Sequence, residues 1–312
     1  MHILVTGGCG YVGSVLVPTL LESGIQVTVV DSMWFGNFLA SHGNLTVLQR
    51  DIRTIESIPM GEVDVVIHLA NIANDPCGEL SAKLSWEVNV LASMQLVEKA
   101  IHHGVKQFIY ASSGSVYGIK EEADVTEDLP LVPISDYNKT KMISERVLLS
   151  YKDYCLVQCV RPATICGYSP RMRLDLSVNM LTMQALCHQK ITVFGGEQTR
   201  PNIHIKDMVA VYMHLLEQGD KAPGIYNAGF ENMSIMEIAR QVKEFIPAEI
   251  VVTESNDPRS YRLNSDKLLH TGFQPKYGVV KGILEVIEAY QSQKLKDEEG
   301  WYNIKTMRKL SL

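Results

Sequence analysis

A tyrosine and a lysine four residues apart are the side chains in this sequence whose types and spacing could do chemistry together. Tyr137 and Lys141 stand in the stretch SDYNKTK, and on a helix they would project from the same face. An ammonium group beside a phenol favours the phenolate and lowers a pKa that is ordinarily about 10. Such a tyrosine can act as a general acid or base. The same spacing also occurs in plain surface pairs, so its meaning depends on the surrounding elements.

A serine-rich segment precedes this pair. The stretch YASSGSVYG carries Ser112, Ser113 and Ser115 at the end of an apolar run. In parallel sheets the carboxyl ends of strands are where ligands bind. We expect one of these hydroxyls to hydrogen-bond a substrate oxygen and to share its proton with Tyr137, although a serine here could also satisfy only backbone groups.

Short apolar runs alternate with helical patterns through the first half of the chain. Val/Ile/Leu-rich strands separated by helices predict a parallel sheet covered on both faces, an α/β doubly wound fold. We predict strands over 2–6, 26–31, 45–51, 63–70, 106–113 and 155–163, and helices over 11–24, 80–104 and 135–153, the last capped by Ser135 or Asp136. After about residue 165 the pattern becomes irregular. We therefore predict a Rossmann domain over 1–165 and a smaller α/β lobe over 166–312, parts of which return to the sheet.

A glycine-rich turn joins the first strand to the first helix. The segment TGGCGYVG places Gly7 for a tight turn, Gly10 for close approach of a pyrophosphate, and Gly13 for close helix–strand packing. Tyr11 and Val12 lie between them, where the helix N-terminus offers free N–H groups to an anion. This pattern predicts a dinucleotide site.

Acidic residues after the next two strands refine the cofactor. Asp31 ends the second strand, where its carboxylate can accept from the adenine-ribose hydroxyls and would repel a 2′-phosphate, so NAD is favoured over NADP. Asp51, followed by Ile52 after the third strand, is placed to meet the adenine amino group. His68, at the end of the fourth strand, is interpreted as a packing histidine.

Composition excludes several classes of function. The chain has 312 residues, 46% hydrophobic and 21% charged, with a net charge of −6, which argues against nucleic acid as a partner. It shows no apolar run long enough to span a membrane and no signal-peptide pattern, so we expect a cytoplasmic protein. The six cysteines form no CxxC pair, and we predict free thiols and no metal site.

These motifs together resemble the extended short-chain dehydrogenase/reductase family, specifically its nucleotide-sugar epimerases and dehydratases. The resemblance rests on the glycine turn, Asp31, HLAN at 68–71, Asn89, the serine-rich strand end, the Tyr137–Lys141 segment, RPATICG and RPNIHIKD. It implies Tyr137 as catalytic base, Lys141 as the residue that holds the nicotinamide ribose, and Ser113 as the hydroxyl that orients the sugar. It further implies cofactor contacts from Leu69, Ala70, Asn89 and Pro162, and a homodimer formed through the helix of Tyr137 and the helix over 84–102.

The resemblance also implies a nucleotide-diphosphate sugar as substrate. Four residues of the second lobe match positions that hold its diphosphate and base: Asn179, Phe194, Arg200 and Arg259. Either arginine could instead be a solvated surface charge, because many arginines are merely exposed.

Two departures from the family pattern bear on the chemistry. Gly114 and Ser115 occupy the places of the Asp-Glu pair of the 4,6-dehydratases, and neither can act as acid or base in an elimination. The related decarboxylases also carry a glutamate at the place of Ser115, so both reactions are disfavoured. The loop over 71–89 differs from that of the glucose-type 4-epimerases, and its Asp75 and Glu79 could touch an unusual sugar or simply be solvated.

Three functions therefore remain open. The first is an NAD-dependent nucleotide-sugar 4-epimerase, with hydride leaving C4 and returning to its other face. The second is a dehydrogenase or ketoreductase that uses the same residues for one net hydride transfer. The third is an idle NAD-binding regulator, against which the intact Tyr137, Lys141 and Ser113 argue.

Overall fold

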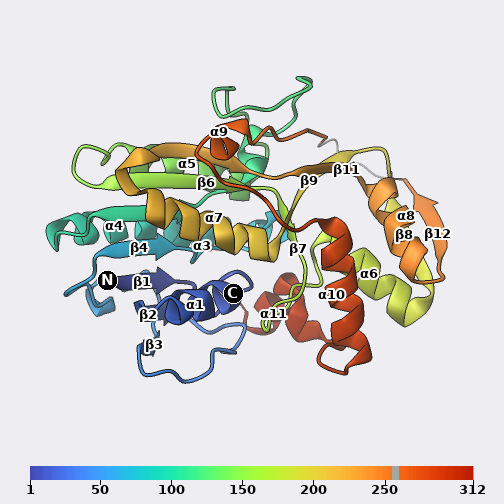
Figure 1. Ribbon diagram of the computed structural model, residues 1–312, viewed down its shortest axis with the longest axis horizontal. Helices are drawn as coiled ribbons and strands as arrows, with labels where there is room; N and C mark the ends of the chain where they lie inside the picture. The colour runs from blue at the N-terminus through green and yellow to red at the C-terminus, as the bar shows by residue number, and fades with distance from the viewer. Residues whose placement is uncertain (255–259, 312) are drawn as a thin grey trace.

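A seven-stranded, fully parallel sheet forms the centre of the molecule in the computed structural model, which describes residues 1–254 and 260–311. Its strand order is β10-β6-β5-β4-β1-β2-β3 (Figure 1). The predicted α/β doubly wound fold is thus confirmed. The strands are β1 (His2–Thr6), β2 (Gln26–Asp31), β3 (Leu45–Gln49), β4 (Val65–His68), β5 (Gln107–Ala111), β6 (Leu156–Pro162) and β10 (Gly224–Ala228).

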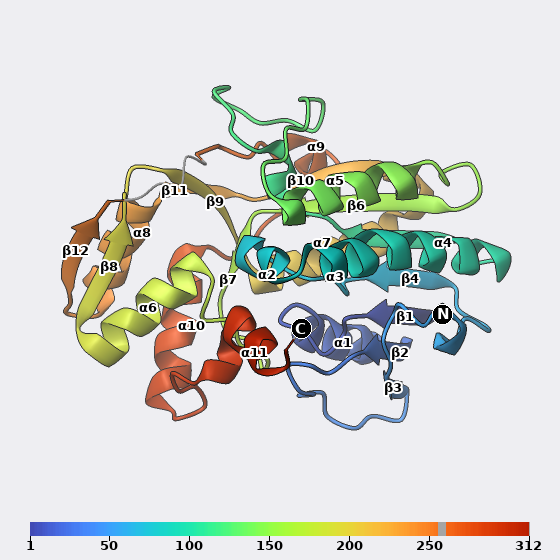
Figure 2. The same ribbon diagram turned by 180° about the vertical axis from the view of Figure 1, so that it is seen from behind.

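Helices cover both faces of this sheet because its strands are apolar on both sides. Along β1, Ile3 and Val5 face a core shared with α1 (Gly13–Glu22) and α7 (Ile205–Gln218). Leu4 faces the opposite core, shared with α4 (Ala92–His102) and α5 (Asp136–Leu149). Figures 1 and 2 show these two helical layers from opposite sides. Alternation along a strand thus sends successive side chains into two separate cores.

The second half of the chain builds a smaller lobe at the carboxyl edge of the sheet. Its strands are β7 (Thr164–Cys166), β8 (Lys190–Phe194), β9 (Thr199–His204), β11 (Glu231–Ser234) and β12 (Glu249–Thr253). They pair as the sheets β11-β9-β7 and β12-β8. Its helices are α6 (Ser177–His188), α8 (Ile235–Phe245), α9 (Asp266–Leu269) and α10 (Val279–Gln291). The division at residue 165 stays a prediction; β7 spans that position, and α7 and β10 lie with the large sheet.

The predicted helix over 80–104 differs from the observed structure in an informative way. The segment forms α3 (Ala82–Trp86), a π-helical turn (Glu87–Leu91) and α4, with a separate short helix α2 (Asp75–Leu80) before it. A π-turn inserts an extra residue into the helix, and such turns are frequent at functional sites. It carries Asn89, whose side chain reaches the neighbouring loop.

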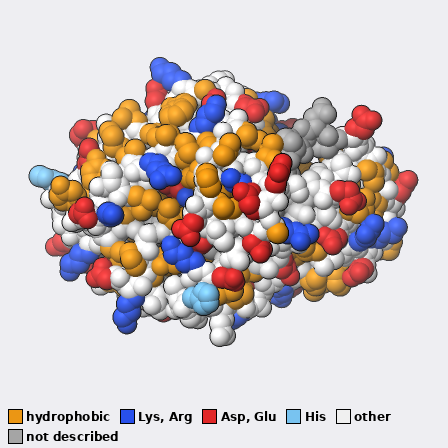
Figure 3. All heavy atoms as spheres, turned by 90° about the horizontal axis from the view of Figure 1, so that it is seen from above, with side chains coloured by type: hydrophobic (Ala, Val, Ile, Leu, Met, Phe, Trp, Pro, Cys, Tyr) orange, Lys and Arg blue, Asp and Glu red, His pale blue; other side chains and the backbone are white. Residues whose placement is uncertain are grey.

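The C-terminal segment returns to the half of the molecule that contains the large sheet. Helix α11 (Asn303–Lys309) contacts α2 (Figure 2), and its Met307 is buried in the same core as Leu4. No helix of the described residues is long and apolar enough to cross a membrane. On the face seen in Figure 3, acidic and basic side chains are interspersed.

Candidate active site

A cavity of about 660 Å³ opens at the carboxyl edge of the large sheet, between the two lobes. Its volume and mixed apolar and polar walls are those of a small-molecule site. Most of the predicted site residues line it: Gly7, Gly10, Tyr11, Val12, Gly13, Asp31, Asp51, Ile52, Leu69, Ala70, Ser113, Tyr137, Pro162, Phe194 and Arg200. Arg259 lies outside the described residues.

The glycine turn has the geometry that its spacing predicts. Gly7 has φ +72°, and a Cβ there would lie 2.6 Å from the backbone nitrogen of Ala70. A Cβ on Gly13 would lie 2.4 Å from the carbonyl oxygen of Gly8, so α1 packs directly on the turn. The bare backbone and the N-terminus of α1 thus line the cavity, and they fit the pyrophosphate of a dinucleotide.

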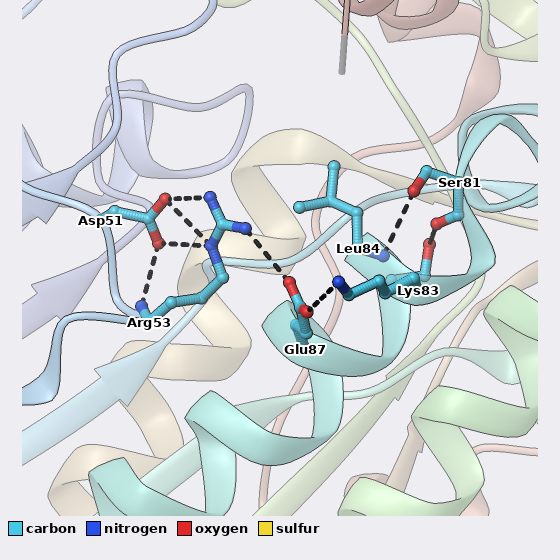
Figure 4. A network of polar contacts seen from close by, with 7 residues as sticks. Asp51, Arg53, Ser81, Lys83, Leu84 and Glu87 are labelled. Atoms are coloured by element: carbon cyan, nitrogen blue, oxygen red, sulfur yellow. Dashed lines mark hydrogen bonds and ion pairs between the residues drawn. The ribbon is translucent and has the colours of Figure 1, made fainter.

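Asp31 and Asp51 line the same region of the cavity, and their pKa values are shifted in opposite directions. The Asp31 carboxylate accepts from the N–H groups of Cys9 at 3.0 Å and Met33 at 2.7 Å, while burial raises its pKa against the effect of these bonds. Asp51 is paired with Arg53 at 2.6 Å (Figure 4). Burial would raise the Asp51 pKa, but the bonds from Arg53 hold it below its usual value. The contact of Asp51 with an adenine amino group stays a prediction.

Tyr137 lies in the first turn of α5. The N-cap of this helix is Ser135, whose hydroxyl accepts from the N–H of Asn138 at 3.1 Å. The Ser113 hydroxyl and the backbone N–H of Asn74 lie close to the phenol and favour its ionised form. Burial raises the pKa of Tyr137 to about 12, and the charge of Asp75 acts in the same direction. Ser113, the charge of Arg173 and the Asn74 N–H act in the opposite direction. The cavity therefore holds a neutral phenol, and Ser113, Asn74 and Arg173 are the neighbours that favour its anion.

The predicted lowering of the Tyr137 pKa by Lys141 is not seen in this structure. Lys141 is buried outside the cavity, and its ammonium donates to the carbonyl of Ala111 at 2.6 Å and lies 4.8 Å from the ring centre of Tyr110. Burial lowers the pKa of Lys141 itself to about 7. The helical spacing places both residues on α5, but the ammonium is held by the strand end, and Ser113, Arg173 and Asn74 replace it in acting on the phenol.

Asn89 and Asn179 also lie outside the cavity wall. Asn89 accepts from the N–H of Ile72 at 2.7 Å and donates to Thr140 of α5 at 3.0 Å. Asn179 accepts from the N–H of Gly167 at 3.0 Å and donates to the Tyr11 hydroxyl at 3.1 Å. Both amides are thus engaged in holding loops around the cavity, which differs from the predicted direct contacts with cofactor and substrate.

Several site residues carried no recognised signal in the sequence. Arg171, Arg173 and Asp175 line the cavity from the loop between β7 and α6, and Arg173 pairs with Asp175 at 2.9 Å. This loop had only an irregular sequence pattern, although two arginines followed by an aspartate at alternate positions were a usable hint. Asp75 lines the cavity and accepts from Ser135, whereas Glu79 is exposed and lies off the wall.

A buried ion pair fixes the helix that carries Tyr137. Glu145 of α5 receives two bonds from Arg161 of β6, at 2.9 and 2.7 Å, and a further bond from the Ser112 hydroxyl. Arg161 also donates to the Tyr117 hydroxyl at 2.7 Å. The pair joins α5 to the ends of β5 and β6, which are the elements that present Tyr137 and Ser113.

His68 is a packing residue in the structure, as predicted. It is fully buried, and its ring nitrogens lie 2.6 Å from the Thr6 hydroxyl and 2.8 Å from the Ser93 hydroxyl. Burial, together with the charge of Lys141, lowers its pKa to about 3. The folded protein therefore keeps this imidazole neutral at pH values where the unfolded chain protonates it.

His68→Gln is expected to flatten the acid side of the stability profile. The folded-state pKa of about 3 lies below the unfolded value of 6.5, so the contribution of His68 is complete above pH 6.5 and declines as the pH falls towards 3. Each pH unit in that window removes up to about 1.4 kcal/mol from the wild type. Urea unfolding between pH 7 and 4 measures the difference, and parallel profiles for the two proteins would contradict this interpretation.

The class of protein follows from this geometry and from comparison with known proteins. A model of the NAD dependent epimerase/dehydratase family matches residues 3–229, and the chain belongs to that family. It is 31% identical to a UDP-glucose 4-epimerase of Halalkalibacterium halodurans, over 91% of this chain and 94% of that protein. The chain is thus an NAD-dependent enzyme of the nucleotide-sugar class.

Two solved structures show how far the likeness extends. The UDP-glucose 4-epimerase of Thermotoga maritima with UDP-glucose has a TM-score of 0.86 and 27% identity, over 95% of this chain and all of that one. The UDP-glucuronic acid 4-epimerase of Bacillus cereus, in complex with UDP-glucuronic acid and NAD, has a TM-score of 0.82 and 25% identity, over 94% and 100%.

Proposed function

We propose that this chain is a nucleotide-sugar 4-epimerase that works through a transient 4-keto sugar, with Tyr137 as the acid and base. The observation that carries the proposal is the set of groups around the phenol. Ser113 and the Asn74 N–H lie close to the phenol and favour its anion, whereas Ser115 donates to the Asn138 side chain at 2.6 Å and Gly114 has no side chain. The segment after β5 therefore offers hydroxyl groups for exchanging a proton at one sugar oxygen, and it offers no acid or base for eliminating water.

NAD, when bound, would supply an oxidised nicotinamide ring that can accept a hydride from C4 and give it back. Tyr137 takes the proton of the C4 hydroxyl, and Ser113 and the Asn74 N–H stabilise the phenolate from which it acts. The nearby cation of Arg173 favours the same anion. When the keto sugar presents its other face, the phenol returns its proton to the oxygen as hydride returns to carbon, so no net redox change remains.

The cofactor and substrate ends of the cavity follow the same proposal. Asp31 would accept from the adenine-ribose hydroxyls and repel a 2′-phosphate, while Leu69, Ala70 and Pro162 would flank the cofactor. Phe194 and Arg200 line the cavity from the second lobe and would hold the base and diphosphate of the sugar nucleotide. We propose a UDP-sugar as substrate, because the two epimerase structures above carry UDP-glucose and UDP-glucuronic acid.

Incubation with UDP-glucose and with UDP-glucuronic acid tests the function. We expect one of them to be converted to its C4 epimer at catalytic NAD, with unchanged absorbance at 340 nm. Stoichiometric NADH would instead indicate the dehydrogenase or ketoreductase alternative. Absence of turnover on all sugar nucleotides tried, together with NAD binding, would favour an idle regulator and would contradict the proposal.

We also propose a cytoplasmic homodimer. Trp86 and Leu91, on the helices that pair across the interface in this family, are 38% and 48% exposed in the single chain. All six cysteines are free thiols, which fits a reducing compartment. Light scattering should give twice the mass of one chain, and a monomer at micromolar concentration would contradict the dimer.

A further inference from the structure

Arg171 brings a buried positive charge to the cavity without a carboxylate partner. The residue is 1% exposed, makes no ion pair within the described parts of the chain, and its Nε has no hydrogen-bond partner there. Its guanidinium donates one bond to the Asn303 side chain, at 2.5 Å, and lies 4.3 Å from the ring centre of Phe35. Arg173, two residues on, is by contrast paired with Asp175. An unpaired buried cation is unfavourable unless an anion joins it.

The loop that carries Arg171 is tied directly to the glycine turn. The Ser169 hydroxyl donates to the carbonyl of Tyr11 at 2.7 Å, and the Tyr11 hydroxyl donates to the carbonyl of Gly167 at 2.6 Å. Arg171 therefore lies two residues after Ser169, which contacts the glycine turn that leads into α1. The charges of Asp175 and Asp31 both act on Arg171, that of Asp175 the more strongly, so the guanidinium lies within reach of the charge of Asp31.

The other side of Arg171 is held by the C-terminal segment. Asn303 and Ile304 line the cavity, the N–H of Asn303 donates to Asp175 at 3.3 Å, and the N–H of Leu174 donates to the Trp301 carbonyl at 2.9 Å. The start of α11 thus lies against the arginine loop and fixes the orientation of the guanidinium through the Asn303 oxygen.

We infer that Arg171 binds the diphosphate bridge of the dinucleotide from the loop beside the glycine turn, with Asn303 as its positioning residue. A planar guanidinium can donate hydrogen bonds to two phosphate oxygens at once. The diphosphate would then be bound by the N-terminus of α1 and by Arg171. Asp31 disfavours a 2′-phosphate in the same region, which leaves the bridge as the anion. The inference rests on the cofactor of the proposed function and not on which reaction the sugar undergoes.

Removal of the Arg171 charge is therefore expected to have opposite effects on the stability of the NAD-free protein and on its affinity for NAD. Burial lowers the pKa of Arg171 to about 9, because its charge is desolvated in the free protein. Arg171→Met keeps an unbranched apolar side chain against Phe35 and removes that charge. We expect the melting temperature of the NAD-free variant to equal or exceed that of the wild type, and its Kd for NAD to rise about 10- to 100-fold.

Calorimetric titration of dinucleotide-free protein with NAD, ADP-ribose, adenosine and UDP locates the contact. Arg171→Met should weaken NAD and ADP-ribose by the same factor and leave adenosine and UDP unchanged. Arg171→Lys keeps the charge but cannot donate to two phosphate oxygens in the same plane, so its Kd for NAD should lie between those of the wild type and Arg171→Met. It serves as the test if the Met variant does not fold. Asn303→Ala should weaken NAD by a smaller factor, and Arg308→Met, exposed on α11, should have no effect.

The outcomes separate this inference from the proposed function. An unchanged Kd for NAD in Arg171→Met, an equal loss for adenosine, or a loss confined to UDP would each overturn the role of Arg171 while leaving the cofactor in place. Failure of the wild type to bind NAD would overturn the cofactor assignment, and with it both proposals.

Discussion

Tyr137→Phe is expected to lower kcat for C4 epimerisation by about 10²- to 10⁴-fold, the range for loss of a general acid or base. The substitution removes only the phenol oxygen, whose ionised form Ser113 and the Asn74 N–H favour. Its ring stays packed against α2, since an ideal Cβ on Gly78 would lie 3.1 Å from the Tyr137 Cβ. Folding and NAD content should therefore be unchanged, so the loss is one of chemistry.

Turnover of the epimerised sugar nucleotide, with dinucleotide content measured on the same preparation, checks this result. Tyr154→Phe is the matched control, because it removes the same oxygen from a side chain that is 73% exposed. Turnover by Tyr137→Phe within a few-fold of the wild type would show that another group moves the proton.

Arg161→Met is expected to destabilise the protein by about 3–5 kcal/mol, the range for removing one partner of a buried ion pair. Glu145 would then keep only the Ser112 hydroxyl in a site where it is 1% exposed. The Tyr117 hydroxyl would also lose its bond from Arg161. Because the pair joins α5 to β6, the catalytic helix should lose its fixed position along with the stability.

The double variant Arg161→Met/Glu145→Leu separates charge burial from packing. Removing both partners leaves no buried carboxylate without its guanidinium. The double variant should therefore recover much of the loss, less the favourable effect of the Glu145 charge on Lys141. Urea unfolding of the two single variants and the double variant measures the coupling. Additive losses, with the double variant the least stable, would contradict an uncompensated glutamate as the cause.

Local signals in the sequence were sufficient to predict the frame of the site. The glycine turn was predictable because a positive φ at Gly7 and the contact of α1 with Gly8 both require the absence of a side chain. The sheet was predictable because continuous apolar runs are typical of strands buried on both faces. His68 stood within such a run, which correctly favoured packing over chemistry.

The surroundings of the phenol could not be predicted in the same way. Asn74 presents its N–H to Tyr137 only because it begins α2 with φ +73°, and the helical pattern of the following residues masked that separate helix. Arg171 and Arg173 reach the cavity through a loop without periodicity. The direction of the Lys141 ammonium depends on the carbonyl of Ala111, a tertiary contact that the spacing of α5 does not encode.

The fate of the hydrogen on C4 tests the central claim most directly. The converted UDP-sugar, labelled with deuterium at C4, should yield the C4 epimer with the deuterium still on C4 and no accumulated NADH, as followed by mass spectrometry and NMR. Deuterium recovered in stoichiometric reduced cofactor, or lost to water during inversion, would contradict a hydride that leaves and returns within one cavity.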